Sequence, residues 1–239
     1  MELIDIHSHI LAGVDDGAEN REMMRRMLKI AWEDGIHTVF ATPHYHPHRG
    51  HASRERWKLA LDTARLEAAL ISPSMRVVEG CEILYRQNTA GLLQEERVCP
   101  LGESRYVLVE FPENAEFSYM LRGLQDLRNE GWLPVLAHVE RYVHVRKAEQ
   151  AERLVGAGAY LQMNADAVLK GQHWRQGAVV RKLLMSGCIH FIGTDAHDDR
   201  IRPPKLRAAY RYIEKLCGAD CAGRLCGENA KKILTREIL

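Results

Sequence analysis

Short apolar segments alternate with amphipathic ones along nearly the whole chain, and this alternation is the feature that most constrains its fold. Most of the apolar segments lack polar residues at every second position, which is typical of parallel strands buried on both faces. The pattern predicts seven strands, at residues 3–7, 38–42, 76–82, 106–110, 134–138, 160–164 and 190–194.

Between these strands, apolar residues recur at the spacing of a helix. In the segment after the first strand, Met24, Met27, Leu28 and Ala31 share one helix face. Glycines stand just beyond several segments, where a left-handed residue commonly ends a helix. The predicted helices span residues 21–34, 53–70, 117–129, 148–155, 176–185 and 204–216.

Seven strands that alternate with helices favour an α/β fold, a distorted TIM-like (β/α)7 barrel whose strand ends converge on one face. An open doubly wound sheet is the alternative, although such a sheet gathers ligands at one crevice instead of around a ring. No linker rich in Pro, Gly or Ser divides the 239 residues, so we expect one domain over residues 1–239.

The overall composition argues against several classes of function. The formal net charge is +1, so no global field favours nucleic acid or an acidic membrane surface. We find no signal peptide and no run of about 18 apolar residues, and therefore expect neither export nor a membrane span. The six cysteines form no Cys-x-x-Cys motif, which is typical of reduced thiols in the cytoplasm.

The first predicted strand ends in two histidines that share a face. Asp5, His7 and His9 occupy alternate positions, and residues two apart on a strand point the same way. Two neutral imidazoles that converge on one point suit a divalent transition metal. A lone His-x-His pair is more simply two surface histidines, so the rest of the chain decides between these interpretations.

The ends of five other predicted strands repeat this arrangement, directly after an apolar run in each case. In a barrel these ends converge on the face that carries active sites. Together with an aspartate in the loop after the first strand, they supply nine candidate metal ligands: His7, His9, Asp16, His44, Glu82, Glu110, His138, Asp195 and His197.

Nine ligands exceed what one ion needs. A single zinc ion takes about three or four protein ligands, so the set suits two or three ions with bridging carboxylates. Imidazole and carboxylate donors without a thiolate favour Mn²⁺, Fe or Zn²⁺ over a structural zinc site of the cysteine type.

Several short motifs, spread over nearly the full length, resemble those of the PHP superfamily, named for polymerase and histidinol phosphatase. Within it, the chain is similar to the manganese-dependent bacterial protein-tyrosine phosphatases of capsule and exopolysaccharide operons. The shared motifs are Asp5-Ile-His-Ser-His-Ile, Val14-Asp-Asp-Gly17, Ser104-Arg-Tyr106, Ala137-His-Val-Glu-Arg-Tyr142, Thr194-Asp-Ala-His197 and Arg202-Pro-Pro204.

The resemblance implies a distorted barrel with a trinuclear manganese site. It assigns the ligands to three ions, held by His7, His9, Glu82 and Asp195, by Glu82, Glu110 and His138, and by Asp16, His44 and His197. Arg141 and Arg202 match the family's phosphate-binding arginines, and a guanidinium fork suits phosphate oxygens in a way that lysine cannot. Ile201 intrudes before the Arg-Pro-Pro motif, so the position of Arg202 depends on how that loop folds.

The resemblance further implies a cytoplasmic metal-dependent phosphatase that hydrolyses phosphotyrosine in proteins, by attack of a hydroxide that bridges two ions. Its implied partner is a bacterial tyrosine autokinase that controls capsular or exopolysaccharide synthesis. Two alternatives stay open: a histidinol-phosphate phosphatase with the same metal chemistry, and a PHP module that binds metal or a partner without catalysis. Metal-dependent hydrolysis of an aryl phosphate, compared with histidinol phosphate, distinguishes them.

Residues beside the predicted ligands have less specific roles. We expect Asp15 to be solvated or to cap a helix, and Asp5 to orient a metal-bound imidazole. His46, His48 and His51 could line the substrate mouth, with His46 as a candidate general acid, although solvated loop histidines are at least as common.

One further motif fits a different kind of phosphatase. The segment from Cys99 to Arg105 has the Cys-x₅-Arg spacing of the phosphate loop in cysteine-dependent tyrosine phosphatases. Pro100 has no N–H to donate, and Glu103 repels phosphate. The segment also precedes a predicted strand, so no helix N-terminus faces an anion there. We therefore expect no catalysis by Cys99.

Overall fold

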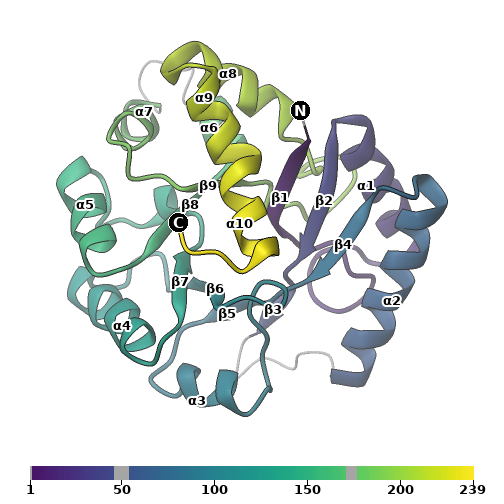
Figure 1. The fold of residues 1–239 in the computed structure, drawn as a ribbon, viewed down its shortest axis with the longest axis horizontal. Coiled ribbons are helices and arrows are strands. Elements are labelled where there is room, and N and C mark those ends of the chain that lie inside the picture. Colours follow the sequence, from purple (N-terminus) through teal and green to yellow (C-terminus); the bar gives the residue numbers. More distant parts are fainter. Residues whose placement is uncertain (1, 46–53, 171–176) are drawn as a thin grey trace.

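Figure 1 shows a ring of strands with helices around its outside. The computed structural model describes residues 2–45, 54–170 and 177–239. Within these residues the strands are β1 (Leu3–Ser8), β2 (Ile36–Ala41), β3 (His44–Tyr45), β4 (Arg76–Glu79), β5 (Glu82–Leu84), β6 (Tyr106–Glu110), β7 (Leu133–Leu136), β8 (Tyr160–Asn164) and β9 (Phe191–Gly193).

The strand predicted at residues 76–82 is broken into β4 and β5, and the strand predicted at 38–42 continues beyond its predicted end as β3. A proline, which has no N–H to donate, interrupts the chain between β2 and β3, and a Gly-Cys pair separates β4 from β5. The pairing keeps one register across the breaks, because Ala41 pairs with Glu79 before them and His44 pairs with Glu82 after them. The pieces therefore continue two strands of one barrel, with an interruption just before the predicted ligands.

The strands close into a ring. Neighbours pair in parallel, in the orders β1-β2-β4 and β3-β5-β6-β7-β8-β9. β1 meets β9 through a parallel bridge between Ser8 and Ala196, and the His9 N–H donates to the Ala196 carbonyl at 2.8 Å. The first and last strands are thus joined, which confirms the predicted α/β fold of the distorted barrel type.

Helices lie at the positions that the periodicity predicts. They are α1 (Arg21–Glu33), α2 (Arg54–Ile71), α4 (Phe117–Asn129), α5 (Ala148–Gly156), α7 (Ala178–Met185) and α8 (Arg207–Cys217), and the predicted starts at residues 53 and 176 fall outside the described residues. The structure also has helical segments that were not predicted. Three are short and have few turns: α3 (Thr89–Gln94), the 3₁₀ turn η1 (Val139–Arg141) and α6 (Ala165–Lys170). The other three follow one another without a break, and the π-helical turn shifts the helical period between its neighbours: α9 (Ala219–Gly223), η2 (Arg224–Glu228) and α10 (Asn229–Thr235).

An inner cluster of apolar side chains fills the barrel. It includes Ile6 from β1 and Leu108 from β6. α10 adds Ile233 to this cluster and crosses one end of the ring (Figure 1). The chain after α10 reaches the start of β6, where the Tyr106 hydroxyl donates to the Glu237 carbonyl at 3.2 Å. The C-terminal residues therefore close the end at which the strands begin, and they leave the other end for a site.

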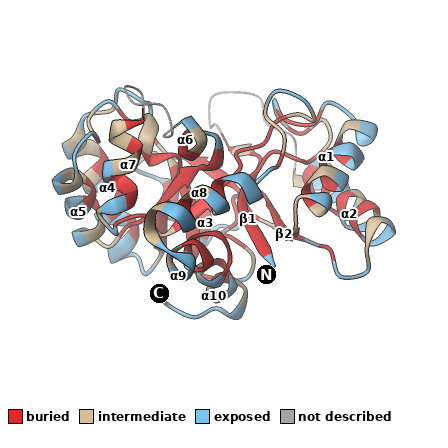
Figure 2. Cartoon of the chain, turned by 90° about the horizontal axis from the view of Figure 1, so that it is seen from above, coloured by how far each residue is buried: buried red, intermediate tan, exposed pale blue. Residues whose placement is uncertain are grey.

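Helices cover the outside of the strands. Figure 2 shows the strands buried and the outward helix faces exposed. In α1, Met24, Met27, Leu28 and Ala31 are all buried, as the spacing predicts. No helix among the described residues is both long and apolar enough to cross a membrane.

Candidate metal centre

The two histidines of the first strand are brought together by an irregularity in that strand. The pairing of β1 with β2 shifts its register between Asp5 and Ser8, and a bulge of this kind re-aims side chains at the rim of a barrel. His7 and His9 are fully buried, and their Nε2 atoms lie 3.2 Å apart. The two imidazoles therefore point at one place.

The carboxylate of Glu82 lies at the centre of the cluster and is fully buried. Its Oε2 atom lies 3.2 Å from Nε2 of both His7 and His9, and 3.0 Å from Nδ1 of His44. Its Oε1 atom lies 2.9 Å from Nε2 of His138. One carboxylate thus contacts four imidazoles, a position that suits a ligand shared between ions.

Two more carboxylates border Glu82. Oδ1 of Asp195 lies 3.5 Å from Nε2 of His7 and 3.4 Å from Nε2 of His9. Oε2 of Glu110 lies 3.7 Å from Nε2 of His138. Asp195 follows β9 and Glu110 ends β6, so separate strand ends deliver the negative charge.

Asp16 and His197 complete the cluster at the rim. Oδ1 of Asp16 lies 3.6 Å from Nε2 of His44 and 3.6 Å from Nε2 of His197. The Asp16 side chain is 70% exposed, whereas that of His197 is 10% exposed, so the cluster opens to solvent at Asp16. The structure thus brings all nine predicted side chains to the end of the barrel opposite α10.

The donor atoms lie close enough together to hold metal ions. Two imidazole nitrogens that face each other at 3.2 Å offer converging lone pairs when both rings are neutral, which fits a shared cation. The donors are imidazoles and carboxylates, the set that suits Mn²⁺, Fe or Zn²⁺. Donor atoms within 4.8 Å of one another occur in three groups among the described residues: His9, Asp16, His44 and His197; His7, His9 and Asp195; and His44, Glu82 and Glu110.

The groups of the cluster shift one another's pKa values strongly. Burial lowers the pKa of His7, but Glu82 and Asp195 outweigh it, and the pKa is raised. For His44, hydrogen bonds to Glu110 and Glu82 outweigh burial and raise the pKa to about 10. The pKa of Glu82 lies well below its usual value, because neighbouring imidazoles such as His7 outweigh its burial. A cation that binds beside His44 must therefore displace a proton from that imidazole.

Arg141 and Arg202 both reach this cluster. Nη2 of Arg141, in η1 directly after His138, lies 2.6 Å from Oδ2 of Asp195. Nη2 of Arg202 lies 2.7 Å from the same oxygen and also donates to the Asp195 carbonyl at 2.9 Å. The two guanidinium groups thus converge on one carboxylate oxygen of a predicted ligand, which places both arginines beside the cluster.

The loop before Arg202 accommodates Ile201 by turning its side chain outward. Ile201 is 88% exposed. The Asp198 carboxylate accepts the backbone N–H groups of Arg200, Ile201 and Arg202, which folds the loop into a tight turn. The additional residue therefore does not move Arg202 away from Asp195.

Asp15 orients a predicted ligand instead of facing solvent. Its side chain is 6% exposed, and its Oδ2 atom lies 2.7 Å from Nδ1 of His9 and accepts the His44 N–H at 3.0 Å. Burial opposes ionisation, but His9 and these hydrogen bonds lower the pKa of Asp15 to about 2. The expectation that Asp15 is solvated or caps a helix is wrong, because the loop folds back over His9.

The expectation for Asp5 is also wrong. Its carboxylate accepts the backbone N–H groups of Thr194 at 2.9 Å and of His7 at 3.2 Å, and no hydrogen bond joins it to an imidazole among the described residues. Burial raises the pKa of Asp5 to about 6 despite these donors. Asp5 therefore ties β1 to the end of β9, where the barrel closes.

Gln162 and Asn164, at the end of β8, are not among the predicted site residues, because those are all His, Asp, Glu or Arg. Gln162 and Asn164 are 0% and 1% exposed. Oε1 of Gln162 lies 3.1 Å from Nδ1 of His7 and accepts the His138 N–H at 2.7 Å. Their spacing of two residues within an apolar strand is the same signal that marks the histidines of β1.

Cys99 lies outside the cluster and is buried. Its Sγ atom lies 3.9 Å from Nη1 of Arg54. Burial, together with the charge of Glu79, raises the pKa of Cys99 to about 12 despite this arginine. A thiol that stays protonated is a poor nucleophile, which agrees with the expectation of no catalysis there. His46, His48 and His51 lie outside the described residues.

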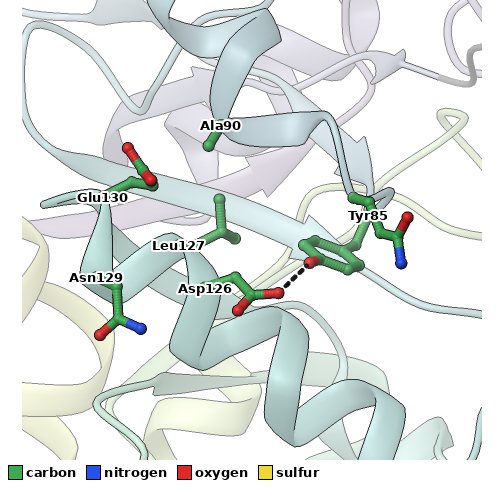
Figure 3. A pocket seen from close by; sticks show the side chains of 7 residues that line it. Tyr85, Ala90, Asp126, Leu127, Asn129 and Glu130 are labelled. Carbon is green, nitrogen blue, oxygen red and sulfur yellow. Dashed lines mark hydrogen bonds between the residues drawn. The ribbon is translucent and has the colours of Figure 1, made fainter.

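A pocket of about 270 Å³ opens beside α3 and α4. Its lining residues are Tyr85, Gln87, Ala90, Asp126, Leu127, Asn129 and Glu130 (Figure 3). The Tyr85 hydroxyl donates to Asp126 at 3.2 Å, and Gln94 donates to Glu130 at 3.3 Å. Both carboxylates are thus already hydrogen-bonded, and none of the predicted metal ligands lines this pocket. The chemistry therefore belongs to the cluster at the strand ends.

Comparisons with solved structures agree with this architecture. In the crystal structures of YwqE from Bacillus subtilis and CpsB from Streptococcus pneumoniae, described as metal-dependent tyrosine phosphatases, a chain superposes with a TM-score of 0.91 at 28% identity, covering 99% of this chain and 96% of that chain. A lactonase from Listeria monocytogenes shares only the fold, with a TM-score of 0.64 at 11% identity over 99% of this chain and 95% of its own.

Sequence comparisons identify the family. The tyrosine-protein phosphatase CpsB of Streptococcus pneumoniae is 30% identical over 243 residues, which cover 99% of this chain and 100% of that protein. The tyrosine-protein phosphatase YwqE of Bacillus subtilis is 30% identical over 241 residues, covering 99% of this chain and 93% of its own. The model of the family described as capsular polysaccharide synthesis, CpsB/CapC, matches residues 3–235. The chain therefore belongs to the CpsB/CapC family.

Proposed function

We propose that this protein is a metal-dependent phosphatase that hydrolyses phosphotyrosine in proteins, within one catalytic domain that binds two or three divalent ions, Mn²⁺ in the cell. The observation that carries the proposal is the convergence of nine imidazole and carboxylate side chains beside two arginines that contact one carboxylate oxygen. The tyrosine phosphatase activity named for relatives of matching length supports the substrate class.

The residues divide into those that hold ions and those that hold phosphate. When bound, the ions supply Lewis acidity and a nucleophilic water near neutral pH. Arg141 and Arg202 bind the phosphate oxygens and neutralise the charge that develops on them in the transition state. A tyrosyl leaving group has a pKa of about 10, so its departure depends less on a general acid than the departure of an alkyl oxygen does. The residues proposed to hold ions are His7, His9, Asp16, His44, Glu82, Glu110, His138, Asp195 and His197.

The proposed substrate in the cell is a tyrosine autokinase in the cytoplasm that controls capsular polysaccharide synthesis. The family description, capsular polysaccharide synthesis, supports this partner. The exposed Ile201 beside Arg202 offers an apolar contact to a peptide that brings its phosphotyrosine to the arginines. Release of phosphate from a phosphorylated autokinase, compared with a phosphoserine protein, tests the assignment.

The central experiment measures hydrolysis of p-nitrophenyl phosphate and of a phosphotyrosyl peptide before and after exhaustive chelation. We expect activity to vanish with the metal and to return on addition of Mn²⁺. His7→Ala should lose most activity, because no neighbouring side chain replaces a ligand at the centre of the cluster. His37→Gln is the matched control, since His37 lies near the start of β2 at the opposite end of the barrel.

Full activity with metal content confirmed near zero contradicts the proposal. Faster turnover of histidinol phosphate than of the phosphotyrosyl peptide would assign the same centre to the other phosphatase class. Metal binding with no hydrolysis of any aryl phosphate would support the alternative of a module that binds metal or a partner without catalysis.

A further inference from the structure

Two amide side chains lie behind the predicted ligands, on β8, a strand that supplies none of these ligands. Gln162 and Asn164 alternate on β8 and are 0% and 1% exposed. Buried amides are costly unless they are hydrogen-bonded. Both are bonded here, and every partner is either a predicted ligand or the other amide.

The direction of these hydrogen bonds is set by a backbone group. The N–H of His138 can only donate, so the Gln162 atom that lies 2.7 Å from it must be the carbonyl oxygen Oε1. The amide nitrogen Nε2 therefore faces the other way and donates to Oδ1 of Asn164 at 2.8 Å. Asn164 must then turn its own nitrogen toward Oδ2 of Asp195, which lies 2.8 Å away. A carboxylate oxygen can only accept. The His138 N–H at one end and the Asp195 carboxylate at the other therefore require the same orientation of the two amide groups.

The same oxygen of Gln162 determines where the proton of His7 resides. Nδ1 of His7 lies 3.1 Å from Oε1 of Gln162, and an acceptor there requires a proton on Nδ1. A neutral His7 therefore has its lone pair on Nε2, the nitrogen that faces His9 and Glu82. That is the tautomer that can bind a cation in the cluster.

The chain of amides also joins two strained backbone positions. His138 has φ of +35° and Asp195 has φ of +52°, a left-handed conformation that non-glycine residues rarely adopt. Such strain persists only where the surrounding structure holds it. The amides bond to the backbone of one of these residues and to the carboxylate of the other.

We infer that Gln162 and Asn164 are positioning residues in a hydrogen-bond chain that runs from the His138 N–H to the Asp195 carboxylate. In this chain each group donates to the next. The chain keeps the proton of His7 on Nδ1 and presents the second oxygen of Asp195 to the cluster. The inference rests on the proposed metal site, because His7 and Asp195 act through the ions that they hold. Neither amide touches a reacting atom.

The test compares four variants that keep the shape of β8. Gln162→Met removes the acceptor for His7, whereas Gln162→Glu retains an acceptor at the same place. Asn164→Leu removes the donor to Asp195 and the acceptor for Nε2 of Gln162, and it keeps the Gln162 oxygen that faces His7. Met163→Leu is the matched control, because Met163 is equally buried on the same strand but belongs to the apolar core. Near-UV circular dichroism establishes that each variant is folded.

The first measurement is the proton position on His7. In the zinc-loaded, ¹⁵N-labelled protein, long-range ¹H–¹⁵N spectra should show a protected proton on Nδ1 of His7. We expect this signal to persist in Asn164→Leu, Gln162→Glu and Met163→Leu, and to be lost or to exchange with water in Gln162→Met. A merely structural role does not distinguish methionine from glutamate in this way.

The second measurement is the affinity for zinc, by competition with a chromophoric chelator. We expect Gln162→Met and Asn164→Leu to bind the ion about 10–100-fold more weakly than the control, as for other groups that orient metal ligands. An unchanged His7 signal and affinity in Gln162→Met, with zinc bound as in the wild type, would overturn this inference and leave the metal proposal intact. A wild-type protein that binds no zinc and no manganese would overturn both.

Discussion

At the scale of single residues, one carboxylate oxygen brings the two arginines together beside the cluster. Oδ2 of Asp195 accepts from Arg141, Arg202 and Asn164 at 2.6, 2.7 and 2.8 Å. The two guanidinium groups are 34% and 38% exposed, so both are accessible from solvent. In the proposed function they would bind the phosphate oxygens, as preorganised donors to a developing negative charge.

Arg141→Ala and Arg202→Ala should each reduce kcat/KM with metal content unchanged. The expected loss is about 2–4 kcal/mol of transition-state binding, as for other preorganised donors. Lysine should rescue only part of it, because it supplies charge without the planar fork. Arg105→Ala is the control, since Arg105 is exposed at the start of β6, at the opposite end of the barrel. Wild-type kinetics in both alanine variants would mean that the two arginines form salt bridges with Asp195 and do not bind phosphate.

Cys99 provides a test of pH dependence away from the cluster. Burial raises its pKa from 9.0 to about 12, so the unfolded thiol ionises near pH 9 while the folded one keeps its proton. The folded state then binds more protons, and its contribution to stability is complete below pH 9 and falls as the pH rises toward 12. For one such group, the free energy of unfolding falls by about 1.4 kcal/mol per pH unit in this range.

Cys99→Ser should therefore keep near-normal turnover and lose less stability than the wild type between pH 9 and pH 10.5. Urea unfolding at both pH values, compared with neutral pH, measures the difference. A loss of activity of several hundred-fold with fold and metals intact would instead mean that Cys99 is catalytic.

At the scale of elements, the loop that carries Arg202 leads into α8, and a side chain at the end of α1 fixes the start of that helix. Asp34, at the end of α1, accepts the backbone N–H groups of Leu206 and Arg207 at 2.7 Å each. The carboxylate thus satisfies free N–H groups at the start of α8 from a distant part of the chain. The side chain also places negative charge at the positive end of the helix dipole.

Asp34→Ala should lower the free energy of unfolding by about 1 kcal/mol, the usual cost of losing a helix cap. The measurement is urea unfolding, with Asp62→Ala as the control because Asp62 is 69% exposed on α2. Equal stability of the two variants would mean that α8 does not depend on this cap.

At the scale of the whole molecule, the cluster joins parts of the chain that are far apart in sequence. Its side chains arrive from β1, β3, β5 and β6 and from the segments after β1, β7 and β9. An ion held among these strands would bind only the folded ring, because the unfolded chain offers no preformed site. Such binding would add to the stability of the fold by mass action.

Removal of the metal should lower the melting temperature, and Mn²⁺ should restore it. At a free-ion concentration of about 100 times the Kd, binding at one site adds about 2.7 kcal/mol to the free energy of unfolding. The shift should survive in His37→Gln and be largely lost in His7→Ala. A melting temperature that is insensitive to chelation in the wild type, with metal loss verified, would contradict binding at this centre.

The sequence by itself determined the type of barrel and the set of side chains at its open end. Both follow from local patterns, because continuous apolar runs predict strands buried on both faces and parallel strand ends converge at one rim. His7, Glu82 and His138 meet within 3.2 Å for this reason, although they stand on three different strand ends. The helical stretch that ends in α10 was not predicted, because the π-helical turn η2 interrupts its α-helical period.

Only the tertiary structure decided how the predicted ligands are oriented. Asp15 and Asp5 are both acidic neighbours of the histidines, yet the first contacts an imidazole and the second holds backbone groups. The partner of His7 on its outer nitrogen is Gln162, 155 positions away in sequence. Closure of the ring between β1 and β9 brings these two together. Hydrogen-bond partners across such a closure carry no local period, so no pattern along the chain predicts them.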